Sequence, residues 1–379
     1  MNWKIPLFKS YWEKDDIESI AKVIRRGTYW ATGPEIKKFE DKIAKYIGVK
    51  YALTFNSGTS ALHTVLLAHG ITSGEVIVPS FTFIATANAV ILAGAKPVFA
   101  ETEDISFGLD ATDVKKRITK KTKAIIPIHY GGLASKDIEN LREICDDKNL
   151  LLIEDAAESF GSKINNKLVG TFGDSSMFSF CQNKVITTGE GGVILTDSEG
   201  VYEKMKLIRS HGRVEEQSGD FFSTTKTMDY IDVGYNYRMP TMIAALGLSQ
   251  LNKIDKVIKM RRKNAKFLDD KLSKIPEIIT PQVSNNQFCV YQMYSIILKN
   301  QKDRDSLQKH LSDAGIMTKV YFDPVHLKTY YKKFGYKKGD LPKTEELSNK
   351  VLTLPMYPAL TQKELSLITS SIIGFFKGR

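Results

Sequence analysis

Hydrophobic residues recur at helical spacing in two stretches near the start of the chain, residues 14–26 and 34–47. From residue 51 onward the pattern changes, because short apolar runs alternate with segments of helical spacing. The apolar runs lie at residues 51–55, 75–79, 97–100, 123–128 and 150–154, and the helical segments at 61–67, 84–92 and 137–145. Strands separated by helices predict a mostly parallel sheet with helices on both faces, which is an α/β fold.

The second half of the chain predicts a smaller α+β unit. We expect a helix at 199–210, a long loop up to about residue 228, and a long helix from about residue 244 to 272 that bridges two domains. Beyond it the pattern predicts strands at 291–298 and 317–322, and helices at 303–314 and 362–376. Since 379 residues exceed what one hydrophobic core usually organises, two domains are predicted, residues 1–245 and 246–379.

Composition narrows the class of protein without assigning a function. No apolar run approaches the roughly 18 to 20 uncharged residues of a membrane-spanning helix, and the charged start at residues 1–4 lacks the apolar core of a signal peptide. We therefore expect a cytoplasmic protein without a membrane partner. Cys145, Cys181 and Cys289 are odd in number and far apart, which argues against disulfides and against a zinc site of the CxxC type, so no metal is predicted.

The formal net charge of +11 raises nucleic acid as a partner, because clustered Lys and Arg side chains bind phosphates through counterion release. Here the lysines are spread through segments such as 113–123 and 253–266 and alternate with acids, and no nucleic-acid motif accompanies them. This pattern is typical of a solvated basic surface, and we predict no nucleic-acid partner. An anionic small substrate would also suit such a surface.

The small residues 56–60, Asn-Ser-Gly-Thr-Ser, lie where a predicted strand turns into a helix. Backbone N–H groups and hydroxyls at a helix start point at an anion, helped by the positive end of the helix dipole, so one interpretation is a phosphate site. The other is an ordinary helix cap, because Ser and Thr are favoured there without any ligand.

Asp155 and Lys184 are the other two candidates for chemistry. Asp155 closes the apolar strand at 150–154, which is a costly place for a carboxylate unless it is a helix cap or has a cationic partner. Lys184 lies between the apolar run 178–180 and a turn rich in Thr and Gly at 187–192, although most of the lysines in this chain must be surface residues. A lysine amine, a carboxylate for a pyridinium nitrogen, a phosphate site and an aromatic ring are the parts that pyridoxal phosphate needs.

Five motifs carry a resemblance to a known family. They are Asn-Ser-Gly-Thr-Ser-Ala-Leu at 56–62, Pro-Ser-Phe-Thr-Phe at 79–83, Glu-Asp-Ala-Ala-Glu-Ser at 154–159, Phe-Ser-Phe at 178–180 with Lys184 and Gly-Glu-Gly-Gly at 189–192, and Gly-Tyr-Asn-Tyr-Arg-Met at 234–239. In this order they resemble the DegT/DnrJ/EryC1/StrS sugar aminotransferases over essentially the whole chain. The resemblance implies the aspartate-aminotransferase-like fold type I, a large domain with a mostly parallel seven-stranded sheet, and pyridoxal phosphate as cofactor.

The resemblance also implies a role for each motif residue toward the cofactor. Lys184 is the catalytic lysine that forms the Schiff base, Asp155 pairs with the pyridinium nitrogen, and Phe83 packs on the ring. The residues expected to hold the phosphate are Gly58, Thr59, Ser60 and Ser179. Asn236 matches a residue that in the family reaches the phosphate of the neighbouring subunit's cofactor, which implies a homodimer with shared active sites. Glu158 lies near the cofactor's 3-oxygen, where many members carry Gln or His and perosamine-type members carry Glu.

Substrate and reaction are implied by the same resemblance. The turn Thr187-Thr188-Gly189-Glu190 is similar to members that aminate C4 of the sugar, whereas members that aminate C3 more often carry Gly-Asp-Gly-Gly. We therefore expect a nucleotide-linked 4-keto-6-deoxy sugar to be converted to its 4-amino product, with L-glutamate as amino donor, as in perosamine synthases. Trp30, Tyr321 and His326 are the candidate substrate contacts, and for His326 a purely structural role is an equal alternative.

Three other functions remain open at this stage. A 3-keto-sugar aminotransferase would use the same residues. A pyridoxal-phosphate-dependent sugar dehydratase of the same family carries histidine in place of the lysine, so Lys184 argues against it. A non-catalytic regulatory or binding protein on the same fold would not need Lys184 and Asp155 together.

Overall fold

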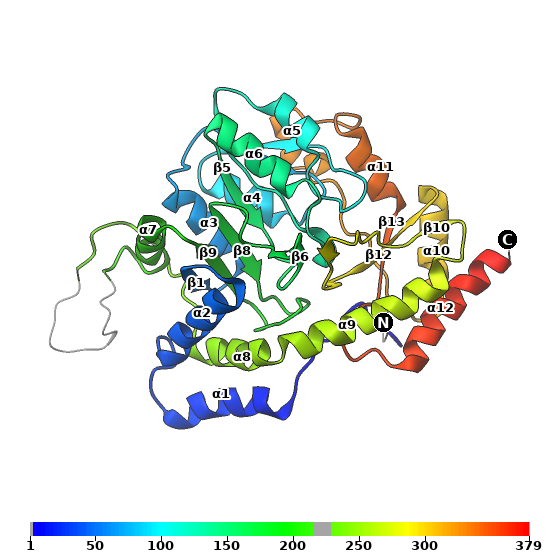
Figure 1. Cartoon of the computed structure of the whole chain (residues 1–379), viewed down its shortest axis with the longest axis horizontal. Helices are drawn as coiled ribbons and strands as arrows, with labels where there is room; N and C mark the ends of the chain where they lie inside the picture. Colours follow the sequence, from blue (N-terminus) through cyan, green and yellow to red (C-terminus); the bar gives the residue numbers. More distant parts are fainter. Residues whose placement is uncertain (1–2, 215–228, 379) are drawn as a thin grey trace.

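The largest element of the computed structural model, which describes residues 3–214 and 229–378, is a seven-stranded sheet wrapped by helices (Figure 1). Its strand order is β1-β9-β8-β5-β4-β2-β3. The strands are β1 Tyr51–Phe55, β9 Gly192–Thr196, β8 Ser175–Ser179, β5 Leu151–Asp155, β4 Thr122–Ile125, β2 Glu75–Pro79 and β3 Lys96–Ala100. All pairs from β8 to β3 are parallel, whereas β9 is antiparallel to both of its neighbours. The predicted α/β fold is confirmed.

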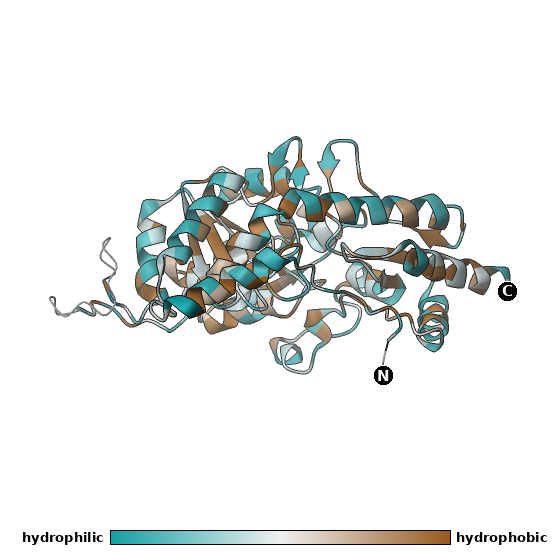
Figure 2. Cartoon of the chain, turned by 90° about the horizontal axis from the view of Figure 1, so that it is seen from below, coloured by the Kyte–Doolittle hydropathy of each residue, from teal (hydrophilic) through white to brown (hydrophobic). Residues whose placement is uncertain are grey.

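Each strand of this sheet sends alternate side chains into two separate hydrophobic cores. In β5, for example, Leu152 packs in one core and Ile153 in the other, as the two-residue period of a strand requires. The core that contains Leu152 is covered by α2 Pro34–Ile47, α5 Ala111–Arg117, α6 Ile138–Lys148 and α8 Thr241–Asn252. The core that contains Ile153 is covered by α3 Gly58–Ala68, α4 Ala85–Leu92 and α7 Glu199–Arg209. In Figure 2 the helices turn hydrophilic residues outward and hydrophobic ones toward these cores.

A third core, built mainly from residues after 264, forms the smaller α+β unit. Its antiparallel sheet has the order β10-β12-β13, with β10 Ile278–Ile279, β12 Tyr294–Leu298 and β13 Val351–Leu354. Its helices are α10 Gln301–Asp313, α11 Pro342–Lys350 and α12 Gln362–Lys377. Short elements complete the chain, namely β6 Lys163–Ile164, β7 Lys167–Leu168 and β11 Gln287–Phe288 in a third sheet, and the single turns η1 Tyr130–Gly132, η2 Val325–Leu327 and η3 Tyr331–Phe334.

Two predicted elements differ from the structure. The strand expected at 317–322 is wrong, because this segment meets β13 only at one bridge between Lys319 and Thr353 and then turns so that the Tyr321 carbonyl accepts a hydrogen bond from the Tyr130 hydroxyl. The long helix is divided into α8 and α9, Ile254–Leu272, at Lys253, whose ammonium group binds two aspartates at the start of α1, Lys14–Arg26. The loop expected up to residue 228 falls largely outside the described residues.

The core contacts also bear on where the two units meet. Val257 and Ile258 in the first half of α9 pack with the large sheet, whereas Ala265 and Leu268 in its second half pack in the third core. Ile5, near the start of the chain, belongs to the third core as well. The division at residues 245 and 246 stays a prediction, and the change of core lies further along, within α9.

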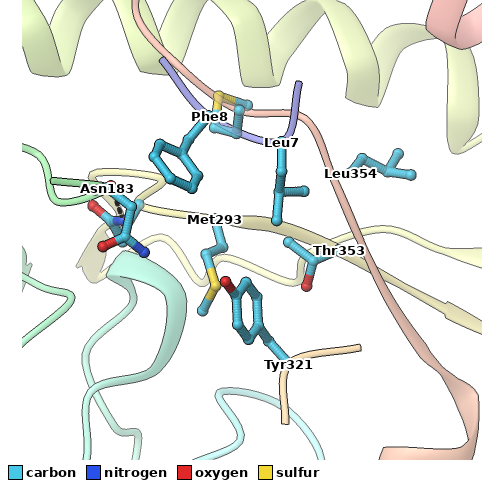
Figure 3. A pocket seen from close by; sticks show the side chains of 9 residues that line it. Leu7, Phe8, Asn183, Met293, Tyr321, Thr353 and Leu354 are labelled. Carbon is cyan, nitrogen blue, oxygen red and sulfur yellow. Dashed lines mark hydrogen bonds between the residues drawn. The ribbon is translucent and has the colours of Figure 1, made fainter. Parts of the chain in front are cut away.

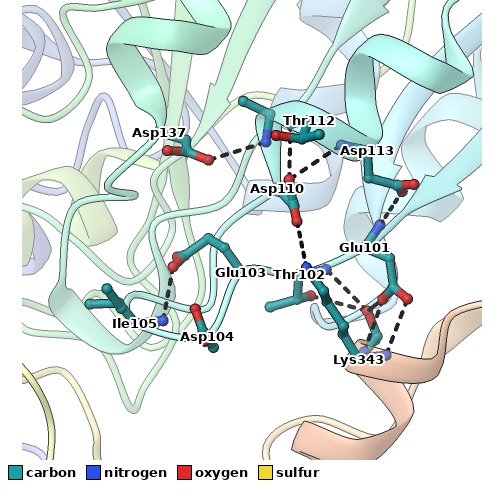
Figure 4. Close-up of polar contacts among 12 residues, drawn as sticks. Glu101, Thr102, Glu103, Asp104, Ile105, Asp110, Thr112, Asp113, Asp137 and Lys343 are labelled. Carbon is teal, nitrogen blue, oxygen red and sulfur yellow. Dashed lines mark hydrogen bonds and ion pairs between the residues drawn. The ribbon is translucent and has the colours of Figure 1, made fainter.

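Buried acids join the smaller unit to the large sheet (Figure 4). The Glu101 carboxylate accepts hydrogen bonds from the N–H groups of Lys343 and Thr344 in the first turn of α11, at 3.1 and 2.9 Å. An anion at this position is favoured by the helix dipole. Asp110 binds the Lys343 ammonium at 3.0 Å, so this acidic cluster is engaged in structural contacts.

Over the described residues, no helix combines the length and the apolar character that crossing a membrane requires. In the same part of the chain, no group of three or more His, Cys, Asp or Glu side chains is arranged to hold a metal ion. All three cysteines are free thiols.

Candidate active site

The candidate residues gather where the parallel strands end. Asp155 is the last residue of β5, Ser179 is the last residue of β8, and Phe83 follows β2 within the turn that leads into α4. Because these three strands are parallel members of one sheet, their carboxyl ends share an edge, which is where ligands bind in open α/β sheets. The sheet therefore brings together residues that are up to about a hundred positions apart.

Asp155 is buried and its carboxylate is held by neutral donors. Its Oδ2 accepts a hydrogen bond from the Thr86 hydroxyl at 2.7 Å, and its Oδ1 accepts one from the Ala157 N–H at 3.2 Å. Burial raises the pKa of Asp155, while the hydrogen bonds from Thr86 and Ala157 and the charge of Lys184 oppose the rise. Among the described residues Asp155 forms no ion pair, so a cationic group placed beside it would stabilise its charged form.

Lys184 lies beside a second carboxylate. Its Nζ is 3.4 Å from Oε1 of Glu158, and both side chains are mostly buried. The other oxygen of Glu158, Oε2, accepts a hydrogen bond from the Gly131 N–H at 2.9 Å, which fixes the carboxylate in place. The amine, Asp155 and Glu158 are close enough for both Lys184 and Glu158 to affect the pKa of Asp155.

Close packing of the α3 start against the sheet makes a narrow cradle. A Cβ atom on Gly192 would lie 2.7 Å from the Gly58 nitrogen and from the carbonyl of Ser57, and one on Gly58 would lie 3.3 Å from Cβ of Ser179. Ser57 caps the helix, because its Oγ accepts a hydrogen bond from the Ser60 N–H at 3.1 Å. The N–H groups of Gly58 and Thr59, at the first two helical positions, have no acceptor within the helix and are available to an anion.

Ser60 and Asn236 lie beside this cradle. The Ser60 hydroxyl donates a hydrogen bond to Oδ1 of Asn56 at 2.6 Å, and Nδ2 of Asn56 donates one to the carbonyl of Asn236 at 3.4 Å. Asn236 is exposed. The described chain thus places Asn236 next to the start of its own α3, and its predicted contact with a neighbouring subunit stays a prediction.

Phe83 is an exposed aromatic residue close to Asp155. Its ring is 61% exposed and lies 6.5 Å, centre to centre, from the ring of Phe322. Its carbonyl is 3.3 Å from the Thr86 hydroxyl, which also contacts Asp155. An aromatic face left this open beside a carboxylate is suited to stacking on a planar cationic ring.

The three candidate substrate contacts have different surroundings. Tyr321 is half-buried, and burial together with the negative charge of Glu158 raises the pKa of its hydroxyl, which places Tyr321 in electrostatic reach of the site. Trp30 is 47% exposed, with its Nε1–H donated to the Val23 carbonyl and its own carbonyl accepting from the Thr241 N–H. Its contacts are therefore with α1 and α8, and a substrate contact for Trp30 stays a prediction.

The third candidate, His326, lies in the interior of the chain. The side chain is fully buried, with Nδ1 2.7 Å from the Ser80 hydroxyl and Nε2 3.2 Å from Oε1 of Glu345. Burial lowers the pKa of His326, which favours the neutral ring in this pair of contacts. These contacts join η2 to the end of β2, and a substrate contact for His326 stays a prediction.

Two residues at the site went unnoticed in the sequence pattern. Thr86 orients Asp155, and the Gly131 N–H orients Glu158. Thr86 is one of several threonines at helix starts, and only the three-dimensional pairing of its hydroxyl with Asp155 distinguishes it. The stretch His129-Tyr130-Gly131 does fall at the end of a predicted strand, so its location was a usable signal, although the role of a main-chain N–H was not.

These groups fit pyridoxal phosphate. The cradle at α3 can hold its phosphate, Asp155 can meet a positively charged ring nitrogen, and Lys184 can reach its carbonyl carbon. The fit rests on a buried carboxylate without an ion pair in the described chain and on glycines that leave the cradle open.

A mostly buried lysine amine 3.4 Å from a carboxylate, at the carboxyl edge of a mostly parallel sheet and near a helix start, is the arrangement of an aminotransferase of fold type I. The model of the DegT/DnrJ/EryC1/StrS aminotransferase family matches residues 11–373. The chain belongs to this family, and it is an enzyme of the sugar aminotransferase class.

Similar proteins span the whole chain. A relative named GDP-perosamine synthase, from Vibrio cholerae, is 37% identical over 375 residues, which cover 98% of this chain and 99% of the relative. A Shewanella sediminis protein named UDP-4-amino-4-deoxy-L-arabinose–oxoglutarate aminotransferase is 30% identical and covers 97% of both chains. Among solved structures, the Helicobacter pylori aminotransferase PseC, involved in pseudoaminic acid biosynthesis, aligns with a TM-score of 0.91 at 29% identity, covering 99% of this chain and all of the other.

Proposed function

We propose that the protein transfers an amino group from L-glutamate to C4 of a nucleotide-linked 4-keto-6-deoxy sugar, with pyridoxal phosphate as cofactor. When bound, the cofactor supplies an electron sink for the carbon that loses a proton. The single observation that carries the proposal is the Lys184 amine, held 3.4 Å from Glu158 and within electrostatic reach of buried Asp155.

Each residue of the candidate site has a defined role in this proposal. Lys184 would hold the cofactor through its amine, and as a free amine it would move a proton to and from the reacting carbon. Asp155 would favour the protonated ring nitrogen, and the phosphate would be held by Gly58, Thr59, Ser60 and Ser179. Phe83 would offer its exposed ring to the planar ring of the cofactor. Glu158 accepts a hydrogen bond from the Gly131 N–H, and it would orient the Lys184 amine when that amine is free.

The choice of substrates rests on relatives and on one motif. The Vibrio cholerae relative is named for perosamine, a 4-amino sugar, and the Shewanella sediminis relative is named for oxoglutarate, the keto acid left when glutamate gives up its amino group. The turn at residues 187–190 likewise favours C4 over C3 as the sugar carbon that is aminated. A homodimer with shared sites, in which Asn236 reaches the neighbouring phosphate, is part of the proposal.

The experiment that tests the proposal is incubation of the purified protein with pyridoxal phosphate, glutamate and a panel of GDP-, dTDP- and UDP-linked 4-keto-6-deoxy sugars. We expect a 4-amino product, identified by mass and NMR. Lys184→Ala should abolish both turnover and the visible absorbance of the lysine-bound cofactor, whereas Lys50→Ala, at an exposed position outside the site, should leave both unchanged. A Lys184→Ala protein with full activity would contradict the assignment.

A further inference from the structure

Glu154, the first residue of the motif at 154–159, points away from the candidate site. It is fully buried on the face of β5 opposite to Asp155, because successive residues of a strand point to opposite sides. Its carboxylate accepts hydrogen bonds from three main-chain N–H groups of the loop at 170–173, at 2.7 to 2.8 Å. A buried carboxylate is costly without such donors, and its fourth donor is the ring of His129.

The buried ring of His129 is held at both of its nitrogens. Its Nε2 lies 3.0 Å from Oε2 of Glu154, and its Nδ1 lies 3.0 Å from the main-chain nitrogen of Ser135. Since a main-chain N–H can only donate, Nδ1 is the acceptor, and the ring donates its Nε2 hydrogen to Glu154. The His129 side chain therefore closes the segment 129–135 into a loop and attaches this loop to β5.

The main chain of His129 joins the same loop to the residues of the candidate site. Its N–H donates a hydrogen bond to the Asp155 carbonyl at 3.1 Å, and its carbonyl accepts one from the Ser159 hydroxyl at 2.7 Å. Two positions further on, the Gly131 N–H donates to Oε2 of Glu158 at 2.9 Å. The other oxygen of this carboxylate is the one that faces the lysine amine.

The turn that carries this N–H depends on its anchors. Gly131 and Gly132 both have positive φ, 64° and 97°, in the region that glycine adopts readily and other residues rarely do. The smaller unit holds one side of the turn, because the Met293 N–H donates to the Gly131 carbonyl and the Tyr130 hydroxyl donates to the Tyr321 carbonyl. Met293 and Tyr321 line the same small hollow (Figure 3). On the side of the large sheet, the histidine is the anchor.

We propose that His129 is a positioning residue for the amino transfer. Through its contacts with Glu154 and Ser135 it fixes the loop, so that the Gly131 N–H holds Glu158 beside the lysine amine. This role rests on the proposed function, in which the amine moves a proton in both half-reactions. Loss of His129 should therefore slow both halves, whereas loss of a residue that contacts only one substrate would slow one half.

Single-turnover kinetics of the two half-reactions provide the first test. His129→Asn keeps an acceptor for the Ser135 N–H but is too short to reach Glu154. We expect it to slow both halves about ten- to hundredfold, the scale of one hydrogen bond to a charged group, with each KM within about threefold of the wild-type value. His129→Gln, which can still donate to Glu154, should lose less than about fivefold. A Gln variant as slow as the Asn variant would overturn the role of the Glu154 contact.

His69→Asn is the matched control. His69 also makes a hydrogen bond through its ring, with Nε2 2.9 Å from the Ser175 hydroxyl, but it lies at the end of α3 remote from the cradle. Ser175 is the first residue of β8, at the opposite end of that strand from Ser179. We expect this variant to change both half-reactions by less than about threefold.

A double-mutant cycle separates positioning from a purely structural role. In Glu158→Ala the Gly131 N–H has no carboxylate left to hold, so adding His129→Asn should change the rates by less than about threefold. A purely structural role would cost the same factor in both backgrounds. Ser159→Ala, which removes only the hydroxyl bound to the His129 carbonyl, repeats the cycle if His129→Asn does not fold. Its loss should be up to about tenfold and should also disappear in Glu158→Ala.

Hydrogen exchange in the cofactor-free protein gives a readout independent of turnover. Tyr130-Gly131 is the only Tyr-Gly pair in the sequence, so NMR of protein with labelled tyrosine carbonyls and glycine nitrogens identifies the Gly131 amide. Its exchange should accelerate at least about tenfold in His129→Asn and stay unchanged in His69→Asn. Equal losses in both backgrounds of the cycle, or an unchanged exchange rate, would overturn the positioning role and leave the proposed function intact. A wild-type protein that accepts no amino group from glutamate would overturn both.

Discussion

Gly192 offers a sharp test of the phosphate cradle, because its missing side chain is what lets α3 approach the sheet. In Gly192→Ala the new Cβ would lie 2.7 Å from the Gly58 nitrogen and from the carbon and oxygen of Ser57. An ordinary contact needs at least about 3.4 to 3.5 Å, so the helix start must move by roughly 0.7 Å. Overpacking of this size costs about 1 to 3 kcal/mol of folding free energy.

The same displacement should weaken cofactor binding. The N–H groups of Gly58 and Thr59 would leave the positions from which they meet a phosphate oxygen, and a hydrogen bond to a charged acceptor contributes about 1.5 to 3 kcal/mol. We therefore expect the dissociation constant for pyridoxal phosphate to rise about ten- to hundredfold. Absorbance titration with the cofactor measures this constant, and urea unfolding of the cofactor-free protein measures stability.

Gly200→Ala provides a control of opposite sign. Gly200 is in α7, and a Cβ there would meet no atom within 4 Å. Replacing a helical glycine by alanine should stabilise the protein by up to about 1 kcal/mol without affecting cofactor binding. If Gly192→Ala unfolds at the wild-type urea concentration and binds the cofactor as tightly, the close approach of α3 is not what shapes the cradle.

Three further expectations follow from single contacts. Asp155→Asn should slow the glutamate half-reaction at least about a hundredfold, which is the scale of losing one preorganised electrostatic partner. Asp146→Asn, at an exposed position, should leave the rate unchanged, and stopped-flow absorbance measures both rates. His326→Leu should destabilise the protein by about 1 to 3 kcal/mol in urea because Ser80 and Glu345 lose their partner. Burial lowers the folded-state pKa of His326 below 6.5, so wild-type stability should fall as pH drops below 6.5. The His326→Leu variant should lack that part of the fall. An identical pH profile in the two proteins would contradict this expectation. Burial raises the pKa of Cys145 and Cys289 to about 12, so a thiol reagent should first modify half-exposed Cys181, and a Cys181→Ser protein that reacts equally fast would refute this.

Much of the large sheet was predictable because its strands are short apolar runs between helices. The ends of β2, β5 and β8 carry Phe83, Asp155 and Ser179, so parallel pairing alone brings these residues to one edge. The role of Lys184 was predictable only because these other residues were recognised with it. A lysine in a turn is common, and a buried carboxylate at a strand end is what singles this one out.

The features that were missed depend on contacts between distant segments. The chain at 317–322 has the composition of a strand, yet it meets β13 at a single bridge, and the Tyr321 carbonyl accepts its hydrogen bond from the Tyr130 hydroxyl. The continuous helical pattern is interrupted at Lys253, whose ammonium binds Asp15 and Asp16 of α1. For His326 the sequence left a substrate contact and a structural role equally open, because its partners Ser80 and Glu345 are 246 and 19 positions away. No local pattern encodes such pairings.

The two carboxylates beside Lys184 cannot share one task, because their surroundings differ. Glu158 already faces the amine at 3.4 Å and is steadied by the Gly131 N–H, so its charge has a partner within the chain. Asp155 has only the Thr86 hydroxyl and a main-chain N–H, and burial raises its pKa. A carboxylate in that position gains most from a cation that arrives with a ligand, and Lys184, engaged by Glu158, does not hydrogen-bond to it. We therefore expect Glu158 to orient the lysine amine and Asp155 to meet a positively charged ring nitrogen.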